Sequence, residues 1–130
     1  MIIFGNGGSA AIASHFSIDL TKNSKIRCVN FNESSLLTCF SNDYGYEKIF
    51  VRQLRGYGKK GDVLVGISAS GNSPNLLTAF EYAAASGIET VALTDFDGGK
   101  MKEVADQGVH VPTGMKEYGP AEDVHMILDH

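Results

Sequence analysis

The run DVLVGIS, residues 62–68, limits the possible folds of this chain more than any other segment. Its apolar residues are consecutive instead of alternating, which is typical of a strand buried on both faces of a parallel sheet. The segment ETVALTD, residues 89–95, has the same character, and a helical pattern over residues 74–87 lies between the two. Pro74 suits the first turn of that helix, and Gly87 suits its end. The sequence therefore predicts a βαβ unit, the building block of α/β folds.

Strand and helix patterns alternate along the rest of the chain as well. We expect further strands over residues 1–4, 27–31 and 109–112. We expect further helices over residues 10–20, 34–58 (with a break at 42–45), 100–108 and 121–130. The length of 130 residues fits a single domain over residues 1–130. The sequence thus predicts one α/β domain with a doubly wound, mainly parallel five-stranded sheet flanked by helices.

Composition excludes several classes of function. The net charge is −4 and the basic residues are scattered, so we expect no direct binding to nucleic acid. No apolar run approaches the roughly 20 residues that span a bilayer, and no signal peptide is visible. We therefore expect a cytoplasmic protein without membrane contact. Cys28 and Cys39 form neither a metal-binding pattern nor a disulfide framework and are interpreted as reduced thiols.

The turn GISASGNSPN, residues 66–75, places three serines between the buried strand and the next helix. In α/β folds, ligands bind outside the carboxyl ends of the strands, where the free N–H groups of helix N-termini favour anions. Ser68, Ser70 and Ser73 can therefore donate their hydroxyls to a phosphate. Equally, Ser73 can cap the helix while the other residues form a tight turn. The turn alone leaves both interpretations open.

A second turn of this kind, GNGGSA at residues 5–10, follows the first predicted strand. Its glycines do not match the GxGxxG pattern of dinucleotide-binding proteins, because alanine stands where the third glycine would be. No Gly-Lys-Ser/Thr sequence occurs anywhere, which excludes a P-loop NTPase. We therefore expect no nucleotide cofactor.

Five motifs, taken in order, give a more specific indication: GNGGSA, SNDYG, GDVLVGISASGNSPN, DGGKM and a terminal E-x-x-H-x-x-x-x-H helix. Together they resemble the sugar isomerase (SIS) domain and, within it, the phosphoheptose isomerase family. The agreement covers almost the whole chain. The resemblance implies a flavodoxin-like fold and a homotetramer with active sites between subunits. Family members also have a helical segment before the first strand and a longer last helix, and we expect both to be absent from this chain.

The resemblance implies a phosphorylated sugar as the substrate. Its phosphate is expected to bind to Ser68, Ser70 and Ser73. Family members usually have a threonine between the first two of these serines, where this chain has Ala69. The rest of the substrate is expected to contact Asn6, Gly7, Gly8, Ser9, Asn42, Asp43 and Glu122.

The resemblance also implies a zinc ion held by His15, Asp19, Glu122 and His130. His15 and Asp19 are four residues apart and share a helix face, and Glu122 and His130 are about 80° apart around a helix. All four are competent zinc ligands. Without the resemblance, a His–Asp pair at this spacing is more often an exposed pair on a helix. Asp19 and Glu122 stand where the family usually has glutamate and glutamine.

Two further histidines take no part in the predicted site. His125 is expected to pack in the interior or to line it as a polar group, and His110 has no assigned role.

The reaction implied by the resemblance is aldose–ketose isomerisation through an enediol. By family analogy, Asp19 removes the proton next to the carbonyl, and His130 is its acid–base partner. The leading hypothesis is conversion of sedoheptulose 7-phosphate to D-glycero-D-manno-heptose 7-phosphate for lipopolysaccharide biosynthesis. Two alternatives stay open. One is a non-catalytic SIS module that binds phosphosugars or associates with a replication initiator, and the other is an isomerase of a different phosphosugar.

Overall fold

Parallel strands form the centre of the fold, as the buried apolar runs predict. The computed structural model describes residues 1–130. Its strands pair in the order β2-β1-β3-β4-β5, and every pair is parallel. The predicted α/β architecture with five strands is therefore confirmed. The strands are β1 (Ile2–Gly5), β2 (Val29–Asn30), β3 (Val63–Ser68), β4 (Glu89–Thr94) and β5 (Gln107–His110).

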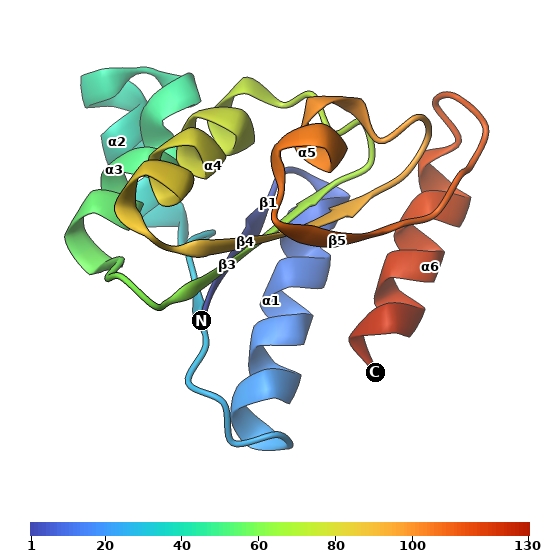
Figure 1. Ribbon diagram of the computed structural model, residues 1–130, viewed down its shortest axis with the longest axis horizontal. Coiled ribbons are helices and arrows are strands. Elements are labelled where there is room, and N and C mark those ends of the chain that lie inside the picture. Colours follow the sequence, from blue (N-terminus) through green and yellow to red (C-terminus); the bar gives the residue numbers. More distant parts are fainter.

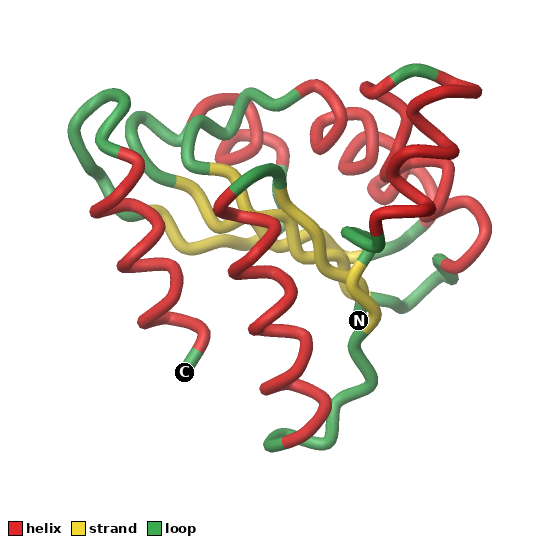
Figure 2. Tube along the Cα trace, turned by 180° about the vertical axis from the view of Figure 1, so that it is seen from behind, coloured by secondary structure: helices red, strands yellow, loops and turns green.

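Helices cover both faces of this sheet (Figure 1). One face carries α1 (Gly8–Lys22) and α6 (Tyr118–Asp129), which lie side by side when the molecule is seen from behind (Figure 2). A 3-10 turn, Tyr46–Lys48, joins the first two helices of the opposite face. The helices of that face are α2 (Ser34–Tyr44), α3 (Ile49–Tyr57), α4 (Pro74–Ser86) and α5 (Gly99–Val104).

The apolar runs are continuous because each central strand packs on both sides. Phe4 and Ile3 are neighbours on β1, yet they belong to different core clusters. Phe4 stacks on Phe50 of α3 with the ring centroids 4.2 Å apart, in the larger cluster. Ile3 packs with Ile12 of α1 in the smaller cluster on the opposite face. The two clusters together fix the sheet between its helical layers.

The prediction of a helix over residues 100–108 is wrong in its second half. The helix α5 ends at Val104, and residues 107–110 form β5. Asp106 causes the change, because its carboxylate accepts hydrogen bonds from the backbone N–H and the hydroxyl of Thr90, both at 2.8 Å. The backbone N–H of Asp106 in turn donates to the Thr90 hydroxyl. These contacts align the chain with β4 and start a strand. The strand predicted over residues 27–31 is also shorter than expected, at two residues.

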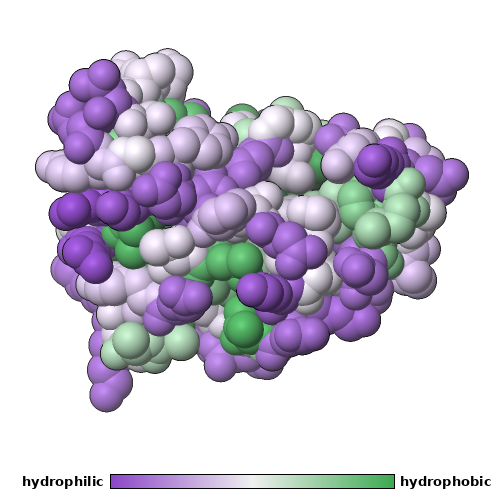
Figure 3. Space-filling view, turned by 90° about the horizontal axis from the view of Figure 1, so that it is seen from above, coloured by the Kyte–Doolittle hydropathy of each residue, from purple (hydrophilic) through white to green (hydrophobic).

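The surface seen from above is largely hydrophilic, with apolar side chains in small patches (Figure 3). No helix combines the length and the apolar character that crossing a membrane requires.

Candidate active site

A pocket opens where the strand order reverses, between the turns that follow β1 and β3. This is the position at which open parallel sheets bind ligands. The cavity has a volume of about 330 Å³, which suits a small molecule. All predicted substrate residues line it except Asn42 and Asp43, which are exposed on α2. The lining residues are Asn6, Gly7, Gly8, Ser9, Ile67, Ser68, Ala69, Ser70, Ser73, Tyr118 and Glu122.

The serine hydroxyls of this pocket are available to a ligand. Ser73 is the N-cap residue of α4, but its side chain makes no capping hydrogen bond and lies 3.5 Å from the Ser68 hydroxyl. The cap interpretation of Ser73 is therefore wrong. The Ser68 and Ser70 oxygens accept hydrogen bonds from backbone N–H groups of the same turn. Because a hydroxyl that accepts can still donate its proton, both residues can donate to an anion.

Asn6 and Asn75 hold the two turns together. Each side-chain amide donates to the oxygen of the other at 2.9 Å, and the Tyr46 hydroxyl also donates to the Asn6 oxygen at 3.1 Å. Asn6 therefore joins the turn after β1 to the start of α4. The sequence analysis missed Asn75, which is 1% exposed. Its position in the first turn of a helix gave no indication of a partner 69 residues away.

A close backbone contact between Gly71 and Gly98 positions the serine turn. Gly71 has φ 61°, and an added Cβ there would overlap the carbonyl oxygen of Gly98 in the turn after β4. The backbone N–H of Met101 donates to the Gly71 carbonyl at 2.9 Å, and that of Lys100 donates to the Asn72 side chain. The turns after β3 and β4 are thus locked to one another, which fixes the serines in place.

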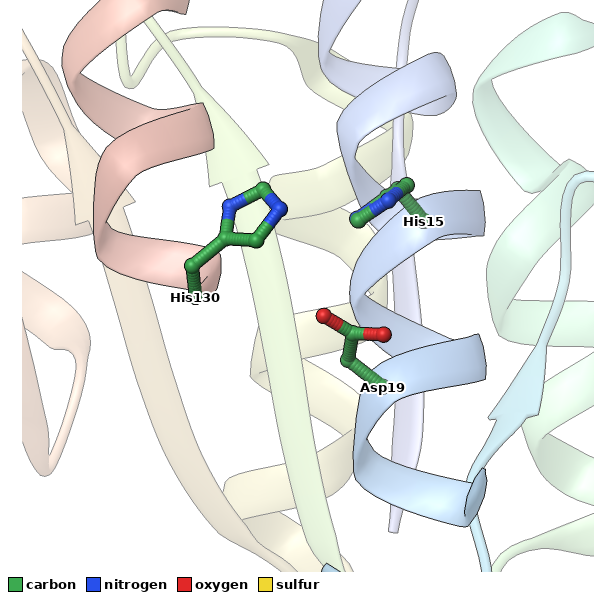
Figure 4. A group of neighbouring side chains, drawn as sticks. All are labelled: His15, Asp19 and His130. Carbon is green, nitrogen blue, oxygen red and sulfur yellow. The ribbon is translucent and has the colours of Figure 1, made fainter. Parts of the chain in front are cut away.

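A second group of functional side chains lies between α1 and α6. His15, Asp19 and His130 point toward one another there (Figure 4). One potential ligand atom from each lies within 4.8 Å of the others. The imidazole rings of His15 and His130 are 4.9 Å apart at their centroids. Two imidazoles and a carboxylate at this separation can converge on one divalent cation, and zinc commonly has three such protein ligands.

In both histidines of this cluster, the Nδ1 atom lies within hydrogen-bond distance of an acceptor oxygen. Nδ1 of His15 lies 2.5 Å from Oδ2 of Asp129, and this hydrogen bond raises the pKa of His15 above its ordinary value. Nδ1 of His130 lies 2.9 Å from the Met126 carbonyl oxygen. The sequence analysis missed Asp129, because its place directly before His130 gives no sign of a contact with a residue on another helix.

Glu122 lies apart from the other three predicted metal ligands. It lines the pocket, and an added Cβ on Gly8 would overlap its carboxylate. Gly8 and His15 are seven residues apart on α1, which corresponds to about 10 Å along the helix axis. The structure therefore brings His15, Asp19 and His130 together and places Glu122 with the serines.

Comparison with known proteins gives this site its family context. The family model of the SIS domain matches residues 1–95. A phosphoheptose isomerase of Helicobacter pylori (strain HPAG1) is 42% identical over 136 residues, which cover all of this chain and 70% of the relative. The chain belongs to the phosphoheptose isomerase family. A phosphoheptose isomerase of Akkermansia muciniphila is 43% identical over 97% of this chain and 69% of its own length.

Solved structures of the phosphoheptose isomerase family have the same fold. The enzyme of Neisseria gonorrhoeae has a TM-score of 0.89 at 38% identity and covers 99% of this chain and 71% of its own. The enzyme of Francisella tularensis has a TM-score of 0.91 at 28% identity, over 99% of this chain and 70% of its own.

This phosphoheptose isomerase family member also contains a buried polar pair near the pocket, since the backbone N–H of Asp95 donates to the carbonyl of the lining residue Ala69. Asp95 follows β4 and His125 lies on α6, and both residues are 0% exposed. Their atoms Oδ2 and Nε2 are 3.1 Å apart, although neither atom has a hydrogen-bond partner. Burial, with a smaller contribution from the charge of Glu122, raises the pKa of Asp95 to about 6 from an ordinary value of 3.8. Burial lowers the pKa of His125.

We expect the substitution Asp95→Asn to stabilise the protein at neutral pH. A raised carboxyl pKa means that the folded state binds the proton more tightly, so the wild type loses stability as pH rises from about 4 through about 6. Asparagine has no charge to bury, so the variant should gain about 3 kcal/mol over the wild type at pH 8, from a shift of about 2.2 pKa units at about 1.4 kcal/mol per unit. The gain should fall to about 1 kcal/mol at pH 4.5, because that pH lies near the lower of the two pKa values and most of the difference in ionisation has not yet developed. Urea unfolding at both pH values measures it.

The exposed residue Asp123 on the same helix as His125 provides the control. Asp123→Asn should shift stability by less than about 0.5 kcal/mol at either pH. A gain for Asp95→Asn of the same size at pH 4.5 and pH 8 would show that ionisation of Asp95 is not its cause.

Proposed function

We propose that this chain is the catalytic domain of an aldose–ketose isomerase that converts sedoheptulose 7-phosphate to D-glycero-D-manno-heptose 7-phosphate, a precursor of lipopolysaccharide heptose. The observation that carries the proposal is the combination on α1 of an anion pocket at its start and a carboxylate–imidazole cluster further along. The relatives named phosphoheptose isomerase support the choice of substrate.

The pocket supplies binding in this proposal. The hydroxyls of Ser68, Ser70 and Ser73, at the N-terminus of α4, would bind the phosphate through hydrogen bonds and the helix dipole. Anchoring the phosphate fixes the sugar relative to the reacting groups, so that the proton transfers take place within one oriented complex. Phosphate binding and chemistry are therefore assigned to different residues and can be tested separately.

The proton transfers fall to Asp19 and His130. Asp19 would take the proton from carbon 1 of the ketose while His130 protonates the carbonyl oxygen on carbon 2, which gives the enediol. Asp19 then returns the proton to carbon 2, and His130 removes the proton from the oxygen on carbon 1, which leaves the aldose. Atoms and charge balance, because each group ends in the state in which it began. The side-chain amide of Asn23 donates to Oδ1 of Asp19 at 3.1 Å and orients the carboxylate.

We further propose that His15, Asp19 and His130 hold a zinc ion. Their three donors lie close enough for one ion, and their chemistry matches that of catalytic zinc sites. Bound zinc would stabilise the negative charge that develops on the substrate oxygens. A zinc-bound His130 would have no free nitrogen with which to protonate an oxygen, because its Nδ1 is held by the Met126 carbonyl. In the zinc-loaded protein His130 would therefore be replaced by the ion in stabilising that oxygen, and the proton would pass between the two substrate oxygens. Metal analysis of the purified protein should find about one zinc per chain, and His15→Ala or His130→Ala should lose it. A metal-free wild type after reconstitution with zinc would refute this site.

A homotetramer with sites between subunits is also proposed. The pocket and the cluster are separated along α1 by about 10 Å or more, and the predicted substrate residues Asn42 and Asp43 are exposed on α2, outside the pocket. A neighbouring copy could bring such exposed residues to a pocket. Light scattering of the protein after size-exclusion chromatography should give four times the mass of one chain, and a stable monomer would contradict it.

Turnover of sedoheptulose 7-phosphate tests the isomerase proposal directly. Zinc-loaded protein should convert it to heptose 7-phosphate, which can be followed by NMR. Binding of the sugar phosphate without any conversion would refute the enzyme and favour a non-catalytic binding module.

We expect Ser73→Ala to weaken phosphate binding without loss of stability. A hydrogen bond to a charged group contributes about 1.5–3 kcal/mol, so affinity for the sugar phosphate should fall about tenfold or more. The free energy of unfolding should change little, because the Ser73 side chain does not cap α4. Isothermal titration calorimetry and thermal unfolding measure the two effects. Ser86→Ala, at the other end of α4, is the control and should leave affinity unchanged. A loss of about 1 kcal/mol of stability with normal affinity would identify Ser73 as a cap after all.

A further inference from the structure

We infer that Asp129 is a positioning residue for the zinc site, because its carboxylate holds the His15 imidazole in the orientation that a metal ligand needs. The inference rests on the proposed binding of zinc by His15, Asp19 and His130. Asp129 itself lies outside that ligand group. It precedes His130 in the sequence, yet its side chain contacts the histidine on the other helix.

The contact determines which nitrogen of His15 is free. Oδ2 of Asp129 lies 2.5 Å from Nδ1 of His15. A carboxylate accepts hydrogen bonds and has no proton to donate, so Nδ1 is the nitrogen that carries hydrogen. In the neutral ring that binds a metal, the lone pair is then on Nε2. Asp129 thus selects one tautomer and one ring orientation.

The second histidine of the cluster is anchored in the same way by a different group. Nδ1 of His130 lies 2.9 Å from the Met126 carbonyl oxygen, which also only accepts. Both rings therefore present Nε2 as the free nitrogen, with their centroids 4.9 Å apart. Partners of this type, a carboxylate or a backbone carbonyl behind each histidine, fix the tautomer and raise the basicity of zinc ligands. Asp129 differs from the Met126 carbonyl in adding a full negative charge.

The burial of Asp129 separates it from an ordinary surface acid. Its side chain is 0% exposed, whereas that of His15 is 42% exposed. Oδ1 of Asp129 has no hydrogen-bond partner, so His15 is the group that compensates the buried carboxylate. Burying a carboxylate is costly without a partner. His15 is therefore the polar partner of the buried Asp129 carboxylate, and the carboxylate holds the imidazole through Nδ1.

Zinc affinity of the full chain tests the inference without any substrate. The dissociation constant is measured by competition with a chromophoric chelator for wild type, Asp129→Leu, Asp129→Asn and the control Asp123→Asn. Asp129→Leu removes the acceptor and should weaken zinc binding by about 10–100-fold. Asp129→Asn keeps an acceptor oxygen in the same place and should lose less. Zinc affinities of both Asp129 variants within twofold of Asp123→Asn would overturn the inference.

A spectroscopic readout keeps the test valid if Asp129→Leu does not fold. In zinc-loaded wild type, nitrogen-15 NMR of the histidine rings should show zinc on Nε2 of His15 and hydrogen on Nδ1. Zinc on Nδ1 would overturn the inference, because Asp129 would then occupy the position of the ion. A wild type that binds no zinc would refute the metal site and this inference together. Normal zinc binding by the wild type with unaffected variants would refute the inference alone.

Discussion

Asp19→Asn is expected to lower kcat for the isomerisation by about 10²–10⁴-fold, the usual contribution of a general base. Asparagine has nearly the same shape, and it can keep the contact with Asn23, but it cannot take a proton from carbon. KM for the sugar phosphate should change only a few-fold, because phosphate binding is proposed for the serine pocket, which Asp19 does not line. Steady-state kinetics at saturating zinc separates the two constants.

Metal content must be measured alongside those kinetics, since Asp19 is also a proposed ligand. With zinc occupancy restored, a persistent loss of kcat assigns proton transfer to Asp19. The exposed carboxylate of Asp123 gives the matched control, because Asp123→Asn removes the same charge outside the site. A kcat for zinc-loaded Asp19→Asn within about threefold of the wild type would exclude Asp19 as the base.

The parts of the fold that could be predicted from the sequence depend on local pattern. The strands β3 and β4 can be recognised in the sequence because a strand packed on both faces is a nearly continuous run of apolar residues. The start of β5 could not be predicted, because it depends on the pairing of Asp106 with Thr90, 16 residues away. A helical pattern over residues 100–108 does not reveal such a partner.

The same distinction applies to the site. The turns after β1 and β3 were recognisable as a ligand pocket because α/β topology places them together. The role of Ser73 was not, because serine suits both a helix cap and a phosphate ligand. Asp129 was overlooked because adjacent helix residues point about 100° apart, so proximity to His130 in the sequence did not predict a contact with His15.

Gly71→Ala is expected to cause the largest loss of stability among the single changes near the pocket, about 3 kcal/mol. An alanine at φ 61° costs about 1–2 kcal/mol, and the rest comes from the overlap of its Cβ with the Gly98 carbonyl oxygen. Neither atom is at the end of a flexible side chain, so one turn must move. The displaced turn carries Ser70 and leads to Ser73, so KM for the sugar phosphate should rise as well. Urea unfolding and steady-state kinetics measure the two effects.

Gly61→Ala separates the two causes of this loss. Gly61 also has a positive φ, 88°, but an added Cβ there meets nothing within 4 Å. This control should lose only the conformational part, about 1–2 kcal/mol, and should leave KM unchanged, because Gly61 is not part of the pocket. Equal losses for the two variants would mean that the contact between the turns after β3 and β4 does not hold the serines. A larger loss for Gly71→Ala together with a raised KM would mean that the fold secures phosphate binding through this backbone contact, independently of the serine hydroxyls.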